Sequence, residues 1–215
     1  MALDMINKSL SGDYSFLKKS KVPYFDSKLA AFELTKKYIN EKNLPVITIF
    51  PGTVVGPGDI HKDISELVER VYKNSMLFTF TGSTSFVDVR DCAEGIYQSM
   101  EKGTIKQSYI ISGTDNYNLS YKEFMKFIAK AALKKGNRVR TNFIKIPHSM
   151  ALLISTIGEI YNPGSNLGTA LVQSGKMIHR FSSDKAKKEL NYHPKYKLIQ
   201  SIQDCNTFLE NNIIT

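Results

Sequence analysis

A tyrosine and a lysine four residues apart, Tyr24 and Lys28, are the side chains of this sequence best suited to proton transfer. Both lie at the start of a segment with helical periodicity, so a helix places them on one face. An unperturbed tyrosine hydroxyl has a pKa of about 10. A neighbouring ammonium group stabilises the phenolate and lowers that pKa, so the hydroxyl exchanges protons with an alcohol or carbonyl near neutral pH. Hydride transfer at a nicotinamide requires such a group beside the reacting carbon.

The spacing alone does not select this pair, because it also separates Tyr14 from Lys18 and Tyr38 from Lys42. The context does select it, since only Tyr24 opens an amphipathic helix that leads directly into an apolar strand. Tyr38 lies at the end of that helix, and Tyr14 precedes any clear element. From the residues alone, two interpretations of the Tyr24 pair stay open: a catalytic pair, or an exposed pair on a helix surface.

A helix followed by a buried strand positions this pair. Apolar residues recur at helical spacing over residues 25–41, and Asn43 and Pro45 end the helix. Residues 46–50 are β-branched and apolar, which is typical of a buried parallel strand. Residues 108–112 form a second strand of this kind. We expect the two strands to pair in parallel and the helix to pack against them.

The remaining elements alternate between helices and short extended segments. Further helices are expected over residues 63–73, 90–102, 120–136, 184–190 and 198–209, and another from Pro147 onward. Extended segments are expected over residues 77–80, 85–89 and 139–146, and a loop over residues 51–59. Asp63 with Glu66, and Ser120 with Glu123, have the spacing of helix capping boxes. This order predicts an α/β architecture with a parallel sheet. Two central strands are too few for a stable doubly wound sheet, so the sequence is interpreted as part of a fold.

Composition excludes several classes of protein. The net charge of +9 comes mostly from lysines that stand singly or in pairs, which is typical of solvated helix faces and disfavours nucleic-acid binding. No segment resembles a signal peptide or is apolar enough to span a membrane, and we expect no membrane association. Two cysteines predict reduced thiols in a cytoplasmic protein. The four histidines lack the spacing of metal ligands, so no metal is expected.

Four segments resemble motifs of one enzyme family, in the order of that family. Residues 24–28 resemble the YxxSK signature of the short-chain dehydrogenase/reductases, and residues 51–59 resemble the PGxVxGPGD loop of the extended members. Residues 86–93 resemble the FVDVRDxA segment of those members, and residues 183–194 resemble their C-terminal SxKAxxELGYxP segment. Together they cover about residues 21 to 210. The chain is most similar to the dihydroflavonol-reductase-like and 3β-hydroxysteroid-dehydrogenase-like relatives among the epimerases and dehydratases.

The resemblance implies an NAD(P)-dependent enzyme that moves hydride to or from a secondary alcohol or ketone. Tyr24 would be the general acid/base, and Lys28 would also hydrogen-bond the nicotinamide ribose. The segment bordering the nicotinamide would be Pro51, Gly52, Thr53 and Val54, and the residues lining the pocket for a small-molecule substrate would be Val55, Gly56, Ser83 and Phe86. For Asp88 and Asp91, helix capping is favoured over direct contact with substrate.

The resemblance also implies an architecture and an assembly. The fold would be an incomplete Rossmann-type doubly wound parallel sheet, with late strands only, and a smaller α/β C-terminal substrate lobe. Residues 1–115 would be a remnant of the NAD(P)-binding domain with a substrate-lobe insertion at about 56–85, and residues 116–215 mainly the substrate lobe. We expect a homodimer through helices 25–42 and 62–74, because the first carries apolar residues on more than one face.

The sequence departs from the family at three places. No Gly-x-Gly-x-x-Gly segment is present, so weak or absent NAD(P) binding is expected for this chain alone. Ser9 and Ser11 lie at a suitable distance for the catalytic serine, but no clear buried strand precedes them. Phe50 stands where many sugar-nucleotide epimerases have arginine. Two hypotheses stay open: the C-terminal half of an oxidoreductase or epimerase, or a non-catalytic binding or dimerisation module.

Overall fold

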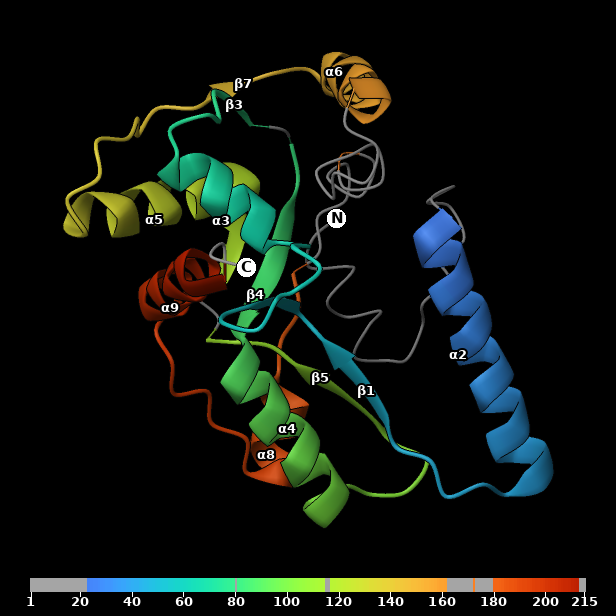
Figure 1. Ribbon diagram of the computed structural model, residues 1–215. Helices are drawn as coiled ribbons and strands as arrows, with labels where there is room; N and C mark the ends of the chain where they lie inside the picture. Colours follow the sequence, from blue (N-terminus) through green and yellow to red (C-terminus); the bar gives the residue numbers. More distant parts are fainter. Residues whose placement is uncertain (1–22, 80, 115–116, 162–171, 173–179, 213–215) are drawn as a thin grey trace.

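Helices alternate with short, mainly parallel strands in the computed structural model of the chain (Figure 1). The structure describes residues 23–79, 81–114, 117–161, 172 and 180–212. The helices are α2 (Pro23–Lys42), α3 (Ser65–Tyr72), α4 (Val89–Lys102), α5 (Tyr121–Lys134), α6 (His148–Tyr161), α8 (Asp184–Leu190) and α9 (Leu198–Asn212). The strands are β1 (Thr48–Pro51), β2 (Thr53–Val55), β3 (Phe78–Thr79), β4 (Ser83–Asp88), β5 (Ser108–Ile111), β6 (Asn118–Ser120) and β7 (Ile144–Lys145). The predicted α/β class with parallel strands is confirmed.

The predicted parallel pair of strands is β1 and β5, with Thr48 opposite Ser108 and Pro51 opposite Ile111. Helix α4 lies on this pair, and its Gly95 lets the two elements approach. A Cβ atom on Gly95 would lie 2.7 Å from Cγ2 of Ile111. Helix α8 contributes Leu190 to the apolar cluster under the same strands. The predicted parallel pairing of the two strands is therefore confirmed.

A second sheet begins immediately after β1, where the sequence predicted only a loop. Strand β2 pairs in parallel with β4, and β4 pairs antiparallel with β6. The chain can turn into this sheet because Gly52 has no side chain: a Cβ atom there would lie 2.6 Å from the carbonyl oxygen of Ser85. The hydroxyl groups of Thr53 and Thr84 are 2.9 Å apart and link the two strands. The loop prediction is wrong for residues 53–55.

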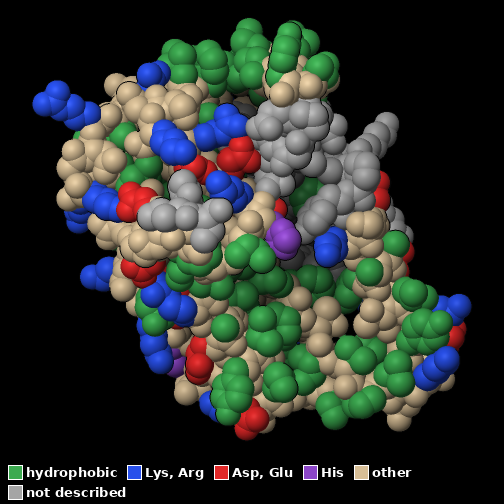
Figure 2. All heavy atoms as spheres, viewed as in Figure 1, with side chains coloured by type: hydrophobic (Ala, Val, Ile, Leu, Met, Phe, Trp, Pro, Cys, Tyr) green, Lys and Arg blue, Asp and Glu red, His purple; other side chains and the backbone are tan. Residues whose placement is uncertain are grey.

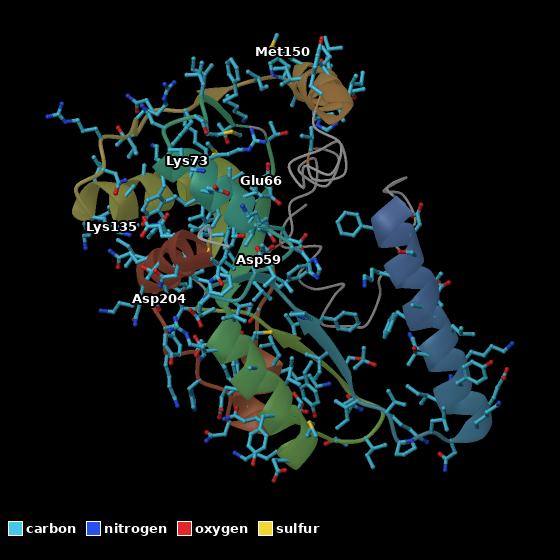
Figure 3. All side chains as sticks on the ribbon, in the orientation of Figure 1. Asp59, Glu66, Lys73, Lys135, Met150 and Asp204 are labelled. Atoms are coloured by element: carbon cyan, nitrogen blue, oxygen red, sulfur yellow. The ribbon has the colours of Figure 1, made fainter. Side chains whose placement is uncertain are left out.

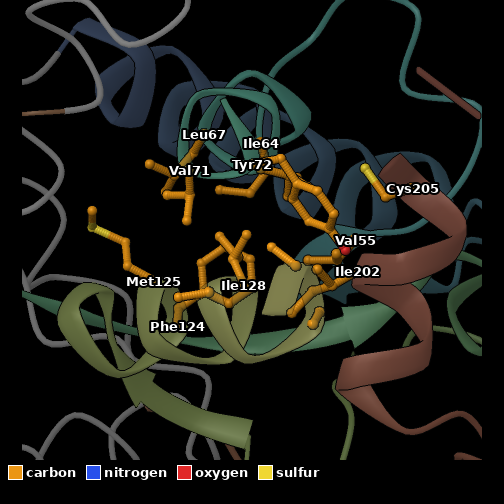
Figure 4. Packing of buried hydrophobic residues seen from close by; sticks show 14 of the residues in the cluster. Val55, Ile64, Leu67, Val71, Tyr72, Phe124, Met125, Ile128, Ile202 and Cys205 are labelled. Atoms are coloured by element: carbon orange, nitrogen blue, oxygen red, sulfur yellow. The ribbon is translucent and has the colours of Figure 1, made fainter. Parts of the chain in front are cut away.

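The main hydrophobic core lies between the β2–β4–β6 sheet and the helices α3, α5 and α9 (Figure 4). Phe86 of β4 and Phe124 of α5 are fully buried, and their rings stack with centroids 4.1 Å apart. Leu67 of α3 and Ile202 of α9 complete the contact from the two other helices. This core joins β2, α3, β4, α5 and α9 through buried side chains.

The start of α3 corrects a prediction about helix capping. The helix begins at Ser65, and Asp63 does not cap it. Instead, the Asp59 carboxylate accepts hydrogen bonds from the backbone N–H groups of Asp63, Ile64 and Ser65, at 3.1, 3.2 and 3.0 Å. The loop turns back between these residues because Lys62 has a positive φ of 55°. Asp59 can cap the helix from four to six residues upstream because the chain turns at Lys62. The spacing of residues in the sequence does not predict this cap.

We expect Asp59→Ala to lower the free energy of unfolding by about 1–2 kcal/mol, because three backbone donors at a helix start lose their acceptor. Asp63→Ala is the matched control, since Asp63 is exposed and makes no capping contact, and it should change stability by less than about 0.5 kcal/mol. Urea unfolding of both variants measures the difference. Equal losses would contradict the assignment of the cap.

Of the other local predictions, some are confirmed and one is only partly correct. The capping box of Ser120 and Glu123 is confirmed, with both reciprocal hydrogen bonds present. Helix α2 ends at Lys42, followed by Asn43 in the left-handed region at a φ of 52°. The strand predicted over 139–146 is reduced to β7, which pairs in parallel with β3. Residues 139–143 form no strand because they find no neighbouring strand to pair with among the described residues.

Candidate active site

The predicted catalytic pair lies at the beginning of α2. Tyr24 and Lys28 are both in the first two turns of the helix, one helical repeat apart. The Lys28 side chain is exposed, whereas the Tyr24 side chain lies outside the described part of the structure. Helix α2 contacts β1 through the rings of Phe32 and Phe50, which meet edge to face with centroids 5.1 Å apart. The helix is thus placed beside the strand that ends at the predicted cofactor segment.

The predicted cofactor segment, Pro51 to Val54, lies where three strands meet. The Gly52 N–H donates a hydrogen bond to the carbonyl of Ile111 at 2.8 Å, which extends the β1–β5 pair. The Gly113 N–H donates to the carbonyl of Phe86 at 2.9 Å, which joins the end of β5 to β4. These are the carboxyl ends of parallel strands, where open α/β sheets bind their ligands. Pro51 is exposed and the other three residues are half-buried, so the segment is accessible from this edge.

The four predicted pocket residues do not share one environment. Val55 and Phe86 are buried in the main core, and Phe86 is stacked on Phe124. Gly56 is buried with a φ of 150°, and a Cβ atom there would lie 2.6 Å from Cγ1 of Val89. The Ser83 hydroxyl is buried and has no hydrogen-bond partner among the described residues, which makes it the member best suited to a polar ligand group. Their role as a pocket lining stays a prediction.

A buried polar network beside β4 was not predicted from the sequence. The Ser85 hydroxyl accepts a hydrogen bond from the Phe181 N–H at 2.7 Å and donates one to the Asn118 side-chain oxygen. The Asn118 amide nitrogen donates to the Phe181 carbonyl at 3.3 Å. The network holds Phe181 on the sheet through Asn118 and Ser85, which lie 63 and 96 positions earlier in the chain. No local sequence pattern could have revealed it.

Asp88, in the segment that resembles FVDVRDxA, caps α4 as predicted. Its carboxylate accepts from the Arg90 N–H at 2.8 Å and forms two further 2.8 Å hydrogen bonds with the Arg90 guanidinium. The same guanidinium binds Asp204 at 2.8 Å and stacks on the ring of Tyr196. Burial acts to raise the pKa of Asp88, but the hydrogen bonds from Arg90 outweigh it, so the pKa lies below its usual value.

This shift predicts the pH dependence of stability. Because the pKa of Asp88 is lower in the folded state, the unfolded state binds the proton first on acidification. The stabilisation is therefore complete above the unfolded pKa, about 3.9, and is lost as the pH falls through the folded pKa. Asp88→Asn removes this titration, so the free energy of unfolding should fall less steeply from about pH 4 to about pH 2 than in wild type. Urea unfolding across this range measures both slopes, and identical slopes would refute the assignment.

Asp91 does not cap a helix, in contrast to the prediction. Its two carboxylate oxygens accept the backbone N–H groups of Lys195 and Tyr196, at 2.9 and 3.0 Å. Burial raises the pKa of Asp91 more than these hydrogen bonds lower it. The carboxylate holds the loop that leads into α9, more than 100 residues along the chain. The interpretation as a helix cap was wrong because this contact is long-range.

Three further properties of the described residues bear on function. No group of three or more His, Cys, Asp or Glu side chains in this part of the structure is arranged to hold a metal ion. None of the described helices has the length and apolar character needed to cross a membrane. Cys92 and Cys205 are both free and buried.

Comparison with known proteins identifies the class to which this fold belongs. The chain aligns with gox2253 at 27% identity and a TM-score of 0.69, covering 87% of this chain and 56% of that chain. It aligns with a nucleoside-diphosphate-sugar epimerase from Pseudomonas aeruginosa at 22% identity and a TM-score of 0.71, covering 91% of this chain and 58% of that chain. It also aligns with a UDP-glucuronic acid 4-epimerase from Bacillus cereus, in complex with UDP-glucuronic acid and NAD. The identity is 19% and the TM-score 0.62, and the alignment covers 88% of this chain and 52% of that chain. The chain matches about half of the short-chain dehydrogenase/reductase fold of these epimerases.

The family follows from the sequence comparison. The family model described as the NAD dependent epimerase/dehydratase family matches residues 6–112. The chain belongs to this family and spans about 55% of the length of its solved structural relatives. A search of curated proteins finds no match.

Proposed function

We propose that this chain is the substrate-side, C-terminal part of an NAD(P)-dependent oxidoreductase or epimerase that acts on a secondary alcohol or ketone. The observation that carries the proposal is the YxxSK signature at residues 24–28, in the first two turns of the helix that leads into β1. Two of its structural relatives, from Bacillus cereus and Bacillus anthracis, were solved with NAD bound. Membership of the same family supports the same cofactor class here.

Each residue has a defined role in this proposal. Tyr24 exchanges the proton with the substrate oxygen, and the Lys28 ammonium lowers the pKa of the tyrosine and binds the nicotinamide ribose. Residues 51–54 border the nicotinamide at the exposed ends of the strands. The substrate pocket is lined by Val55, Gly56, Ser83 and Phe86. The Ser83 hydroxyl, which has no hydrogen-bond partner among the described residues, contacts a polar group of the substrate. When bound, the cofactor accepts or donates the hydride.

The proposed fold is a partial doubly wound sheet. Residues 1–115 would correspond to the later part of an NAD(P)-binding domain with a substrate-lobe insertion at about 56–85, and residues 116–215 to most of the substrate lobe. A further segment would supply the glycine-rich loop that binds the pyrophosphate at a helix N-terminus. The chain alone should therefore bind NAD(P) weakly. A complete enzyme has this chain joined to such a segment.

The test is whether the complete enzyme oxidises or reduces a secondary alcohol or ketone with a rate that depends on Tyr24, followed by the absorbance of NAD(P)H. The alternative, a non-catalytic binding or dimerisation module, is favoured only by the lack of a Gly-x-Gly-x-x-Gly segment in this sequence. Ligand binding without any turnover in the complete assembly would support that alternative.

We also propose a homodimer through α2 and residues 62–74. Helix α2 exposes Leu34 and Tyr38, two side chains that a dimer contact would cover. The apolar residues of α3 are buried in the core of the chain itself, so the contribution of residues 62–74 to a dimer would come from exposed charged residues such as Lys73 (Figure 3). Light scattering at micromolar concentration should give twice the mass of 24.3 kDa, and Leu34→Lys should restore the monomer mass. A wild-type monomer would refute the dimer.

A further inference from the structure

Helix α6 carries its large apolar side chains on its outer face. Six of them recur at helical spacing and form one stripe along the helix: Met150, Leu153, Ile154, Ile157, Ile160 and Tyr161. These side chains are between 44% and 86% exposed. The buried face of the helix consists instead of the small residues Ala151 and Ser155. Surface helices normally show the opposite distribution, with the apolar stripe facing the core.

The apolar surface continues on the β3–β7 pair. Phe78 of β3 and Ile144 of β7 are partners in this pair and are 36% and 54% exposed. The helix is tied to the pair through a small buried cluster, in which Ala151 of α6 packs with Ile146, directly after β7. Hydrophobic side chains gather along one edge of the molecule, over α6 and beside β3 and β7 (Figure 2). We call the stripe on α6 together with Phe78 and Ile144 the α6 surface.

The segment that leads into α6 is cationic. Residues 134–158 include no Asp or Glu and five cations, which are Lys134, Lys135, Arg138, Arg140 and Lys145. Lys135 forms an ion pair with Glu210. The backbone N–H and the side-chain Nε of Arg140 donate to Asn74, at 3.0 and 3.1 Å, which holds the segment beside the chain that enters β3. Lys145 is exposed on β7 itself. The α6 surface is therefore complementary to a partner that combines an apolar layer with negative charge.

A lipid surface has these two properties, and a protein partner fits the stripe less well. Apart from Tyr161, the stripe offers no oxygen or nitrogen atom to a hydrogen bond, whereas protein interfaces have about one hydrogen bond per 100–200 Å². A second copy of this chain would bring the same cations together. Helix α6 lies at the edge of the molecule, and a tyrosine ends the stripe (Figure 1). An exposed apolar helix with adjoining cations and a terminal tyrosine has the composition of helices that lie in the membrane interface.

We propose that the α6 surface docks this chain on an anionic lipid bilayer, with the axis of α6 in the plane of the membrane. The proposal goes beyond the proposed function and does not depend on it. The 14 residues of α6 extend over about 21 Å, less than the roughly 30 Å of the hydrocarbon core, so the helix lies on the bilayer and does not cross it. The expectation of no membrane association rests on the shortness of the apolar run, which excludes a span but not a helix lying on the surface.

Flotation of the full chain with vesicles in a density gradient tests the docking, because aggregates sediment and do not float. We expect the chain to float with vesicles of phosphatidylcholine and phosphatidylserine, and less with phosphatidylcholine alone. Leu153→Glu combined with Ile157→Glu places two charges on the stripe and should lower the partition coefficient at least about tenfold. Ile96→Glu combined with Met100→Glu is the matched control, since both residues are exposed apolar side chains of α4. This control makes the same change in charge and should lower the partition coefficient less than about threefold.

The contribution of the cations is tested separately. Arg138→Gln combined with Lys145→Gln should weaken binding to the anionic vesicles at least about fivefold and leave binding to phosphatidylcholine alone nearly unchanged. Lys102→Gln combined with Lys188→Gln removes two exposed cations from α4 and α8 and should have little effect on either. Equal effects of the two pairs would show that net charge attracts the chain without orienting it, and would overturn the proposed orientation.

A fluorescent reporter gives a second, independent measurement. The sequence contains no tryptophan, so one introduced indole reports only its own surroundings. The emission of Leu153→Trp should shift to shorter wavelength when the anionic vesicles are added, because the ring passes from water into the lipid. Met100→Trp, at a residue 76% exposed on α4, should show no shift.

Three results would overturn the proposal. The first is a wild-type chain that does not float with the anionic vesicles, and the second is an equal loss of binding in the two glutamate double variants. The third is a doubled mass by light scattering without vesicles that Leu153→Glu with Ile157→Glu abolishes, because a second copy of this chain would then cover the α6 surface. All of these measurements are made without NAD(P) or substrate, so their failure is distinguishable from failure of the catalytic proposal.

Discussion

Tyr24→Phe in the complete enzyme is expected to lower kcat by roughly 100- to 10,000-fold. The substitution deletes the proton-transferring hydroxyl group and keeps the aromatic ring. KM should change little, because the loss falls on the transition state and not on substrate binding. Stopped-flow or steady-state absorbance of NAD(P)H gives both constants.

Three further variants make this result specific. Lys28→Met should cause comparable damage, since the roles proposed for the ammonium are to lower the pKa of Tyr24 and to place the cofactor. Tyr14→Phe and Tyr38→Phe should leave the rate nearly unchanged, although both tyrosines precede a lysine by four residues. For Tyr38 the structure supplies a reason: the Lys42 ammonium lies over the face of the ring, 4.8 Å from its centroid. A Tyr24→Phe enzyme with the wild-type rate would show that the catalytic assignment is wrong, whatever the fold.

Features set by neighbours in the sequence could be predicted. The periodicity of α2, the β-branched strands and the capping box of Ser120 and Glu123 each depend on residues a few positions apart. Such signals survive even in part of a fold, because they reflect local geometry and not distant contacts. The helix that carries Tyr24 and the strand that ends at Pro51 are therefore predictable from the sequence alone.

Features set by distant residues could not be predicted. The three residues of β2 form a strand only because β4 runs beside them, about 30 positions later. Asp91 binds the backbone of residues 195 and 196, and Ser85 binds that of Phe181. Hydrophobic pattern also cannot distinguish a pocket wall from a packed core, since both require apolar side chains. Phe86 illustrates this, because its ring is fully buried against Phe124.

Phe124→Ala is expected to lower the free energy of unfolding by about 3–5 kcal/mol, the largest stability effect predicted for this chain. The ring is fully buried, and its removal leaves a cavity beside Phe86 that the surrounding sheet and helices cannot fill. Leu133→Ala on the same helix is the control, because Leu133 is 46% exposed and should cost less than about 1 kcal/mol. Urea or guanidinium unfolding measures both.

The same substitution at Phe86 decides between its two roles. If Phe86 acts only as a core residue, Phe86→Ala should cost about as much as Phe124→Ala, and the double variant should lose less than the sum, because each ring is the main stacking partner of the other. If Phe86 also lines the substrate pocket, the complete Phe86→Ala enzyme should show a raised KM that Phe124→Ala does not share at equal folded fraction. A loss below about 1 kcal/mol for both single variants would mean that the stacked pair is not part of a packed core, and the assignment of β2, β4 and α5 to one hydrophobic core would fail with it.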